Sequence, residues 1–137
     1  MHMALISSKA GAIELERLIA GLLFVSESDS PLHVVQLGPL PELDAPSLLR
    51  ALGRTEMPTV TQHSLGELFE RTVTVQPWHG PAERATVGRY RVLLDFLSTA
   101  LEAARVFRIG AIEVDAYALG KTSDGCWLGI ATKLIET

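Results

Sequence analysis

The hydrophobic pattern of the last third of the chain predicts two β-strands joined by a turn. Residues 106–119 and 126–135 are rich in aliphatic and β-branched side chains. The segment between them, Thr122–Gly125, is typical of a turn, because glycine tolerates a positive φ and aspartate can hydrogen-bond its own backbone. The phase of the apolar positions shifts by one residue at Gly110, and such a shift moves later side chains to the opposite face of a sheet. We therefore expect one long C-terminal hairpin with a bulge or bend at Gly110.

The second strand of this hairpin carries apolar side chains at both alternating positions. Leu128 and Ile130 share one parity, and Trp127 and Ala131 share the other. A strand that is buried on both faces has this composition, so we expect helices to cover both sides of the sheet.

Two longer stretches have the periodicity of amphipathic helices. Residues 11–25 and 82–105 carry apolar side chains at intervals of three and four, which places them on one face of a helix. These positions are Leu15, Leu18, Ile19 and Leu22 in the first stretch, and Val87, Tyr90, Leu94, Leu97, Leu101 and Ala104 in the second. We expect both faces to line the core.

The region between these helices predicts two short helices and two short strands. Asp44 is suited to cap a helix that Gly53 ends. Ser64 and Glu67 form a capping-box pattern for a helix that runs to about Arg71. The expected strands are residues 32–37 and 58–62, and the expected loops are residues 26–31 and 72–81.

Length and composition are those of one ordinary globular domain over residues 1–137. The chain of 137 residues is 47% hydrophobic and 20% charged, which is sufficient to bury a core without disulfides. Cys126 is the only cysteine, so the sequence excludes an intramolecular disulfide and a cysteine-based zinc site. We find no apolar run of transmembrane length and no signal pattern, and therefore expect a cytoplasmic protein without a membrane partner. Met1–Met3 are either native or the remnant of an expression tag.

Charge argues against nucleic acid as a direct ligand. The formal net charge is −4 and the lysines and arginines are not clustered, whereas a nucleic-acid-binding surface is basic. Between Arg17 and Arg50 there is no lysine or arginine, but there are the acidic residues Glu27, Asp29, Glu42 and Asp44. This stretch is either a solvated edge or a negative patch for a cationic or metal-bearing partner.

The sequence contains no motif that predicts an enzyme. It has no phosphate-binding glycine motif and no nucleophile elbow, and its histidines lack the spacing of metal ligands. These histidines are His2, His33, His63 and His79. A Ser–His–Asp set assembled in space stays open, because geometry and not chain order defines such a set. We expect His33 and His63 at strand edges, and Cys126 as inert packing in an apolar strand.

Two further features draw attention to partner binding. Trp78 lies in a loop rich in proline and glycine, not on an apolar stripe, so it either plugs the core or is presented to a partner. The strand pattern continues almost to the last residue, so we expect Thr137 to be held near a sheet end. Its hydroxyl and α-carboxylate would then be fixed oxygen ligands.

Three stretches of the chain resemble the nuclease A inhibitor family. They are residues 21–29, the loop around Trp78, and residues 106–137 with their Leu-Ile-Glu-Thr end, whereas residues 34–62 match only in outline. Members of this family are small bacterial proteins that block a sugar-nonspecific, metal-dependent nuclease of the ββα-metal type. The resemblance implies an α+β fold, a three-layer α/β/α sandwich with a mainly antiparallel sheet. It also implies that the partner is a nonspecific DNA/RNA endonuclease.

The resemblance implies a first contact in the acidic loop. In the family, the glutamate of a Ser-Glu-Ser loop enters the nuclease active site in place of the scissile phosphate. That position here is Glu27, which lies between Ser26 and Ser28. Asp29 adds negative charge beside it, and this charge is expected to raise the association rate in a salt-dependent way.

The resemblance implies two more contacts, at the chain end and in the tryptophan loop. Thr137, preceded by Glu136, would supply a hydroxyl to the nuclease's catalytic Mg²⁺, an ion that prefers oxygen ligands. This Mg²⁺ belongs to the nuclease, so we expect no cofactor in the free protein. The family forms its other contact with an acidic residue followed by tryptophan, but here Pro77 precedes Trp78. The lost charge implies a weaker contact or a different nuclease.

Two other functions stay open from the sequence. The chain could be a non-enzymatic interaction module of the same fold with a non-nuclease partner, an alternative that Pro77 and the divergent middle favour. An enzyme or a small-molecule binder would instead require a deep polar pocket remote from Glu27 and Thr137.

Overall fold

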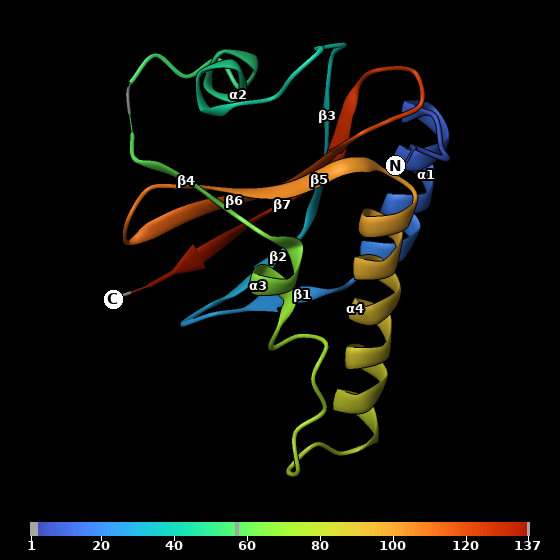
Figure 1. Cartoon of the computed structure of the whole chain (residues 1–137). Helices are drawn as coiled ribbons and strands as arrows, with labels where there is room; N and C mark the ends of the chain where they lie inside the picture. Colours follow the sequence, from blue (N-terminus) through green and yellow to red (C-terminus); the bar gives the residue numbers. More distant parts are fainter. Residues whose placement is uncertain (1–2, 57, 137) are drawn as a thin grey trace.

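A five-stranded antiparallel sheet forms the centre of the protein (Figure 1). The computed structural model describes residues 3–56 and 58–136. The strands lie in the order β3 (His33–Leu37), β7 (Trp127–Ile135), β6 (Glu113–Lys121), β5 (Glu102–Ile109) and β4 (Val60–His63). Beside this sheet lies a two-stranded hairpin of β1 (Leu23–Val25) and β2 (Asp29–Pro31). The arrangement agrees with the predicted α+β class and its mainly antiparallel sheet.

Helices cover both faces of the sheet, as predicted. The helices on one face are α1 (Ser8–Ile19), α3 (Leu65–Phe69) and α4 (Pro81–Thr99), and the helix on the other is α2 (Ala45–Ala51). The larger core includes Leu15, Leu18, Leu93, Leu97, Val114 and Ile130. The smaller core, under α2, includes Leu43, Leu48, Phe107, Leu119 and Trp127. Removal of these apolar side chains from water holds the helices on the sheet.

The predicted pairing of the last two strands is confirmed. β6 and β7 align without a register shift from Glu113 opposite Ile135 to Lys121 opposite Trp127. The turn between them is closed at Gly125, which has a φ of 82°. The sequence predicts Cys126 within the strand. In the structure it lies half-buried in the turn, directly before β7.

The chain reverses direction at Gly110. The prediction of one continuous strand over residues 106–119 is wrong, because β5 and β6 are separate strands that pair antiparallel, with Ile109 opposite Asp115. Gly110 has a φ of 106°, and a Cβ at this position would collide with the carbonyl oxygen of Glu113. A bulge and a tight reversal give the same shift in apolar phase, so the pattern alone does not separate them.

Both long helices end earlier than the apolar stripes predict. α1 ends at Ile19, just before Gly21, whose φ of 75° is typical of a helix stop. The residues that follow form β1, and the predicted loop 26–31 contributes its second half to β2. α4 ends at Thr99, so Ala104 of its predicted stripe lies in β5.

The shorter predicted elements are confirmed. The Asp44 carboxylate caps α2 by accepting a hydrogen bond from the Ser47 amide at 2.9 Å. The Ser64 hydroxyl caps α3 by accepting one from the Glu67 amide at 3.1 Å. The strands predicted at 32–37 and 58–62 correspond to β3 and β4, which form the two edges of the sheet and carry His33 and His63. Met1 and His2 lie outside the described residues, and no helix within those residues is long and apolar enough to cross a membrane.

A glycine at the centre of the sheet allows β7 to lie close to β6. A Cβ on Gly129 would collide with the carbonyl oxygen of Ala118 on β6. Gly129→Ala is therefore expected to lower the free energy of unfolding by roughly 2–3 kcal/mol, since overpacking a core has this cost. The matched control is Gly88→Ala in α4, where the added methyl meets no atom within 4 Å. This control is expected to stabilise the protein by about 0.5–1 kcal/mol in urea unfolding. An unchanged urea midpoint for Gly129→Ala would contradict the pairing of β6 with β7.

Asp124 links the β6–β7 turn to the start of α1. Its carboxylate accepts hydrogen bonds from the Thr122 hydroxyl at 2.5 Å, the Ser8 hydroxyl at 2.7 Å and the Ser8 amide at 2.9 Å. These hydrogen bonds, first that from Thr122, lower the pKa of Asp124 from 3.8 to about 2.

A lowered pKa in the folded state makes stability depend on pH in a defined window. The stabilising contribution of Asp124 is complete above its unfolded pKa of 3.8 and is lost as the pH falls towards 2. Asp124→Asn is therefore expected to lower the urea midpoint at pH 6 and to flatten its decline between pH 5 and 2.5. Asp29→Asn, at an exposed position of β2, is the control and should keep the wild-type slope. An equally steep decline in Asp124→Asn would contradict this assignment.

Candidate protein-interaction site

The acidic loop forms the tip of the β1–β2 hairpin. β1 and β2 pair from Leu23 opposite Pro31 to Val25 opposite Asp29, so Ser26–Ser28 make the connection. The Ser26 amide donates to the Ser28 carbonyl at 2.9 Å, which closes the loop into a tight turn. Glu27 lies at the apex with its side chain exposed. Ser26, Glu27 and Ser28, which are predicted to meet a partner, therefore lie on one tip, and the predicted Asp29 directly follows it in β2.

The side chain of Ser26 ties this tip to the last strand of the protein. Its Oγ accepts a hydrogen bond from the Ile135 amide at 3.0 Å and donates one to the Ser28 carbonyl at 3.3 Å. A second connection between the hairpin and β7 lies at Pro31, the last residue of β2. The Thr132 hydroxyl donates to the Pro31 carbonyl at 2.9 Å. The hairpin is thus fixed to β7 at its tip and at its base.

The chain end is held in the same neighbourhood. The Glu136 amide donates to the Ile112 carbonyl at 2.9 Å, and the Glu136 carboxylate forms an ion pair with Arg108. Thr137 lies outside the described residues, so its predicted role stays a prediction. Figure 1 shows the tip of β1–β2 close to the end of β7, in agreement with the hydrogen bond from Ile135 to Ser26.

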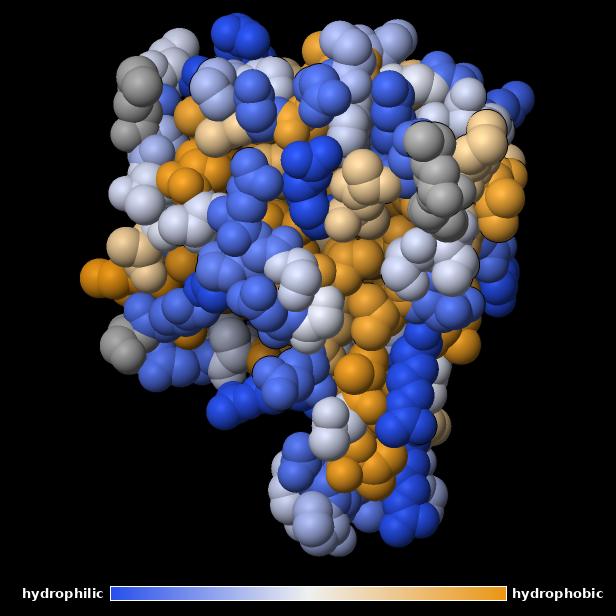
Figure 2. Space-filling model, in the orientation of Figure 1, coloured by the Kyte–Doolittle hydropathy of each residue, from blue (hydrophilic) through white to orange (hydrophobic). Residues whose placement is uncertain are grey.

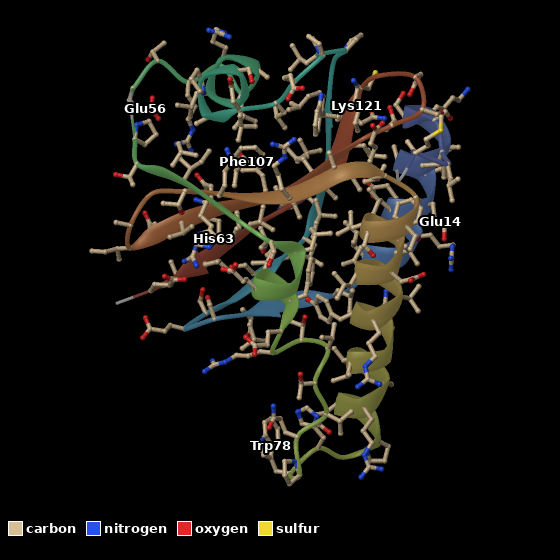
Figure 3. All side chains as sticks on the ribbon, viewed as in Figure 1. Glu14, Glu56, His63, Trp78, Phe107 and Lys121 are labelled. Carbon is tan, nitrogen blue, oxygen red and sulfur yellow. The ribbon has the colours of Figure 1, made fainter. Side chains whose placement is uncertain are left out.

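Trp78 is presented to solvent on a closed turn. Its side chain is 75% exposed, so the alternative that it plugs the core is wrong. The His79 amide donates to the Gln76 carbonyl at 3.0 Å, and the Gln76 amide donates to Nδ1 of His79 at 3.0 Å. Pro77 therefore occupies the second position of a four-residue turn, where its fixed φ is favoured. Figure 3 shows Trp78 near the end of the projecting loop, far below the sheet.

The base of this loop is also fixed. The Glu83 carboxylate accepts a hydrogen bond from the Gly80 amide at 2.9 Å and so caps the start of α4. Hydrogen bonds from backbone amides, first its own and then that of Gly80, lower the pKa of Glu83, which keeps this cap ionised. The guanidinium of Arg91 donates to the Val73 carbonyl at 2.9 Å. Trp78 thus extends from a turn that is hydrogen-bonded to itself, and Val73 and Gly80 on either side of this turn are bonded to α4.

A cleft of about 540 Å³ joins the hairpin to the tryptophan loop. Its lining includes Leu23, Val25 and Ser26 from the hairpin, Gln76, Trp78 and His79 from the loop, and Glu83, Val87 and Tyr90 from α4. Figure 2 shows hydrophobic surface along the side of the projection formed by this loop and α4. The cleft connects two of the regions that the sequence predicts to be contacts.

Tyr90, which lines the cleft, belongs to a buried aromatic cluster. The ring centroids of Phe24, Phe69 and Tyr90 are 6.2 Å apart in each pair. The Tyr90 hydroxyl donates to the Leu23 carbonyl at 2.5 Å, which joins β1 to α4. Burial raises the pKa of Tyr90 to about 12, so this hydroxyl stays a donor at all physiological pH values. This hydrogen bond connects the hairpin wall of the cleft to the wall formed by α4.

The described residues contain no group of three acidic, histidine or cysteine side chains that could hold a metal ion. A second hollow of about 310 Å³ is lined by His33, Asp115, Tyr117 and Lys133, but also by Ser30 of the acidic hairpin. It therefore borders the hairpin that carries Glu27. Asp115 in this hollow is paired with Arg54 at 2.5 Å.

Comparison with protein families assigns the chain to a family. The family model described as Nuclease A inhibitor-like protein matches residues 11–137. The chain belongs to the nuclease A inhibitor-like family. No curated protein matches the chain.

Membership of the nuclease A inhibitor-like family confirms the resemblance and indicates that the role is inhibition of a nuclease. A family of inhibitors is not expected to be catalytic. The structure brings Ser26, Glu27 and Ser28 together with the segment that ends in Glu136, and it places Trp78 across the cleft. The exposed apolar side chains of β1 were missed, because the sequence had assigned them to the end of a helix. Leu23, Phe24 and Val25 are all apolar, so the sequence shows no alternation there, although in the structure Phe24 is buried between two exposed neighbours.

The hydrogen bond between the hairpin tip and β7 can be tested in the free protein. Ser26→Ala removes the acceptor of the Ile135 amide. The hydrogen exchange of this amide is therefore expected to accelerate roughly fivefold, which corresponds to the loss of about 1 kcal/mol of protection. The control is Ser28→Ala, because the Ser28 hydroxyl makes no hydrogen bond with the described residues. Exchange is measured residue by residue with NMR. Equal protection of Ile135 in all three proteins would show that Ser26 does not hold the tip.

Proposed function

We propose that the protein inhibits a sugar-nonspecific, Mg²⁺-dependent nuclease of the ββα-metal type by occupying its active site. Glu27 takes the place of the scissile phosphate, the Thr137 hydroxyl binds the nuclease's Mg²⁺, and Trp78 makes a second contact. The observation that carries this proposal is the hydrogen bond between Ser26 and Ile135, at 3.0 Å. It holds the loop of Glu27 beside the strand that leads to Thr137.

The chemistry of a nuclease active site suits these groups. Such a site neutralises a phosphate with Mg²⁺ and basic side chains, and the Glu27 carboxylate presents compact negative charge without a bond that can be cleaved. Mg²⁺ prefers oxygen ligands in octahedral geometry, which a threonine hydroxyl can join. Since the tip and the turn at Trp78 are both held by internal hydrogen bonds, little conformational entropy is lost on binding.

The finer description of the protein follows from the same proposal. The chain is one domain over residues 1–137, in the three-layer α/β/α arrangement, and it acts in the bacterial cytoplasm. It needs no cofactor of its own and does not bind nucleic acid directly. The hypothesis of a non-nuclease partner draws mainly on Pro77, and the turn position of Pro77 offers another reason for this residue. Proline there stiffens the presentation of Trp78.

Two changes at the proposed contacts test the mechanism. Glu27→Gln keeps the shape of the side chain and removes its charge, so the inhibition constant should rise at least about tenfold, the equivalent of about 1.4 kcal/mol. Two alanines added after Thr137 should weaken inhibition to a similar degree, because the chain end no longer fits against the metal. Both are measured with a purified ββα-metal nuclease in excess Mg²⁺.

The matched control for the first change is Glu16→Gln, at an exposed position of α1 outside the cleft. It removes the same charge from the protein and should leave inhibition unchanged within about twofold. Urea unfolding of each variant shows whether the fold is retained. If the Glu27 variant and the extended chain both inhibit like the wild type, the proposed mechanism is wrong.

A further inference from the structure

Arg71 differs from most arginines of the protein in having an unused guanidinium. Its side chain is exposed and makes no hydrogen bond or ion pair with the residues that the structure describes. In contrast, Arg54 is paired with Asp115, Arg89 donates to the carbonyls that end α1, and Arg91 donates to Val73. A positive charge without an internal partner is available to a binding partner.

Arg71 lines the cleft between the hairpin and the tryptophan loop. The other charged residue of fixed sign in this lining is Glu83, and its carboxylate is already committed to the cap of α4. His79 also faces the cleft, and its Nδ1 accepts the amide of Gln76. The guanidinium of Arg71 is therefore the one cation of the lining, among the described residues, that lacks a counterion or an internal acceptor.

The wall opposite the tryptophan loop is apolar. In β1, Leu23 and Val25 point outward and are 48% and 61% exposed, while Phe24 between them is 6% exposed and lies in the core. Exposed apolar side chains beside a concave surface mark an interaction site more often than isolated ones do. The cleft thus combines apolar surface with a single uncompensated positive charge.

We infer that this cleft selects the nuclease, by accepting a projecting segment that carries an apolar side chain next to a carboxylate. This inference rests on the proposed function and adds the partner chemistry of a third region. The apolar side chain packs on Leu23 and Val25, and the Asp or Glu beside it pairs with Arg71. Because Ser26 and Trp78 both line the cleft, a nuclease that contacts both regions also covers the space between them.

Burial of Arg71 in the complex explains why it would confer selectivity. An arginine that loses water without gaining a counterion destabilises a complex strongly, whereas a well-placed carboxylate removes this penalty. A nuclease that lacks the carboxylate is rejected by the buried charge, even when Glu27 and Trp78 fit. Arg71 is therefore a specificity-determining residue and not a source of general affinity.

The test compares Arg71→Glu with Arg84→Glu. Arg84 is an exposed residue in the first turn of α4 and does not line the cleft, so both variants make the same change in net charge. The probe is the nuclease that the wild type inhibits most tightly within a panel of purified ββα-metal nucleases, in excess Mg²⁺. Arg71→Glu is expected to raise the inhibition constant at least about thirtyfold, and Arg71→Gln about tenfold. Arg84→Glu should stay within about threefold of the wild type.

The direction of the change decides the outcome. A nuclease active site is basic, so a role of Arg71 in general electrostatics alone predicts that Arg71→Glu tightens inhibition. Unchanged or tighter inhibition by Arg71→Glu, with Glu27→Gln still impaired, would overturn the inference and leave the proposed function in place. Failure of the wild type to inhibit any nuclease of the panel would instead overturn both.

The apolar half of the cleft has its own matched pair. Val25→Thr keeps the size and β-branching of the side chain but replaces a methyl group with a hydroxyl, and it is expected to weaken inhibition roughly fivefold. Val92→Thr, at a position of α4 that is 53% exposed and outside the cleft, should have no effect. A second copy of the chain could occupy the cleft in place of the nuclease. Sedimentation of the wild type and of Val25→Thr tests this by measuring whether each protein is a monomer or a dimer. A wild-type dimer that Val25→Thr dissociates would overturn the inference.

Discussion

The antiparallel pairing of β6 with β7 is the constraint on which the rest of the structure depends. The two strands stay in register over their whole length, and Gly129 permits the close approach of β7 to Ala118. β7 in turn pairs with β3 on its other side and carries the N–H group that holds the acidic hairpin. The position of Glu27 is therefore set by the centre of the sheet, although Glu27 itself lies on a small separate hairpin.

The proposed contacts at Glu27 and Trp78 share one physical property, which is that short polar connections hold their loops before binding. The Ser26 hydroxyl holds the tip, the Tyr90 hydroxyl holds β1 against α4, and the turn of Gln76 and His79 holds Trp78. An inhibitor competes with the substrate for a site built to bind phosphate tightly, so affinity lost to ordering would be costly. This arrangement places the exposed side chains of Glu27 and Trp78 on a hydrogen-bonded framework.

The sequence predicts features that depend on local chemistry. Helix caps at Asp44 and Ser64, the turn at Gly125 and the buried stripe of α1 follow from side chains a few residues apart, and the structure confirms them. The reversal at Gly110 and the β1 strand were missed because two conformations share one apolar pattern. The cleft could not be predicted, since its walls come together only through tertiary contacts such as that of Tyr90 with Leu23.

The central claim is that this surface blocks a nuclease, and an activity titration tests it most directly. A purified ββα-metal nuclease is held at fixed concentration with DNA and excess Mg²⁺, and the wild-type protein is added in steps at low and near-physiological salt. The account predicts a fall in activity to zero at one inhibitor per nuclease, with slower association at the higher salt. Full nuclease activity at micromolar protein under both conditions would contradict it.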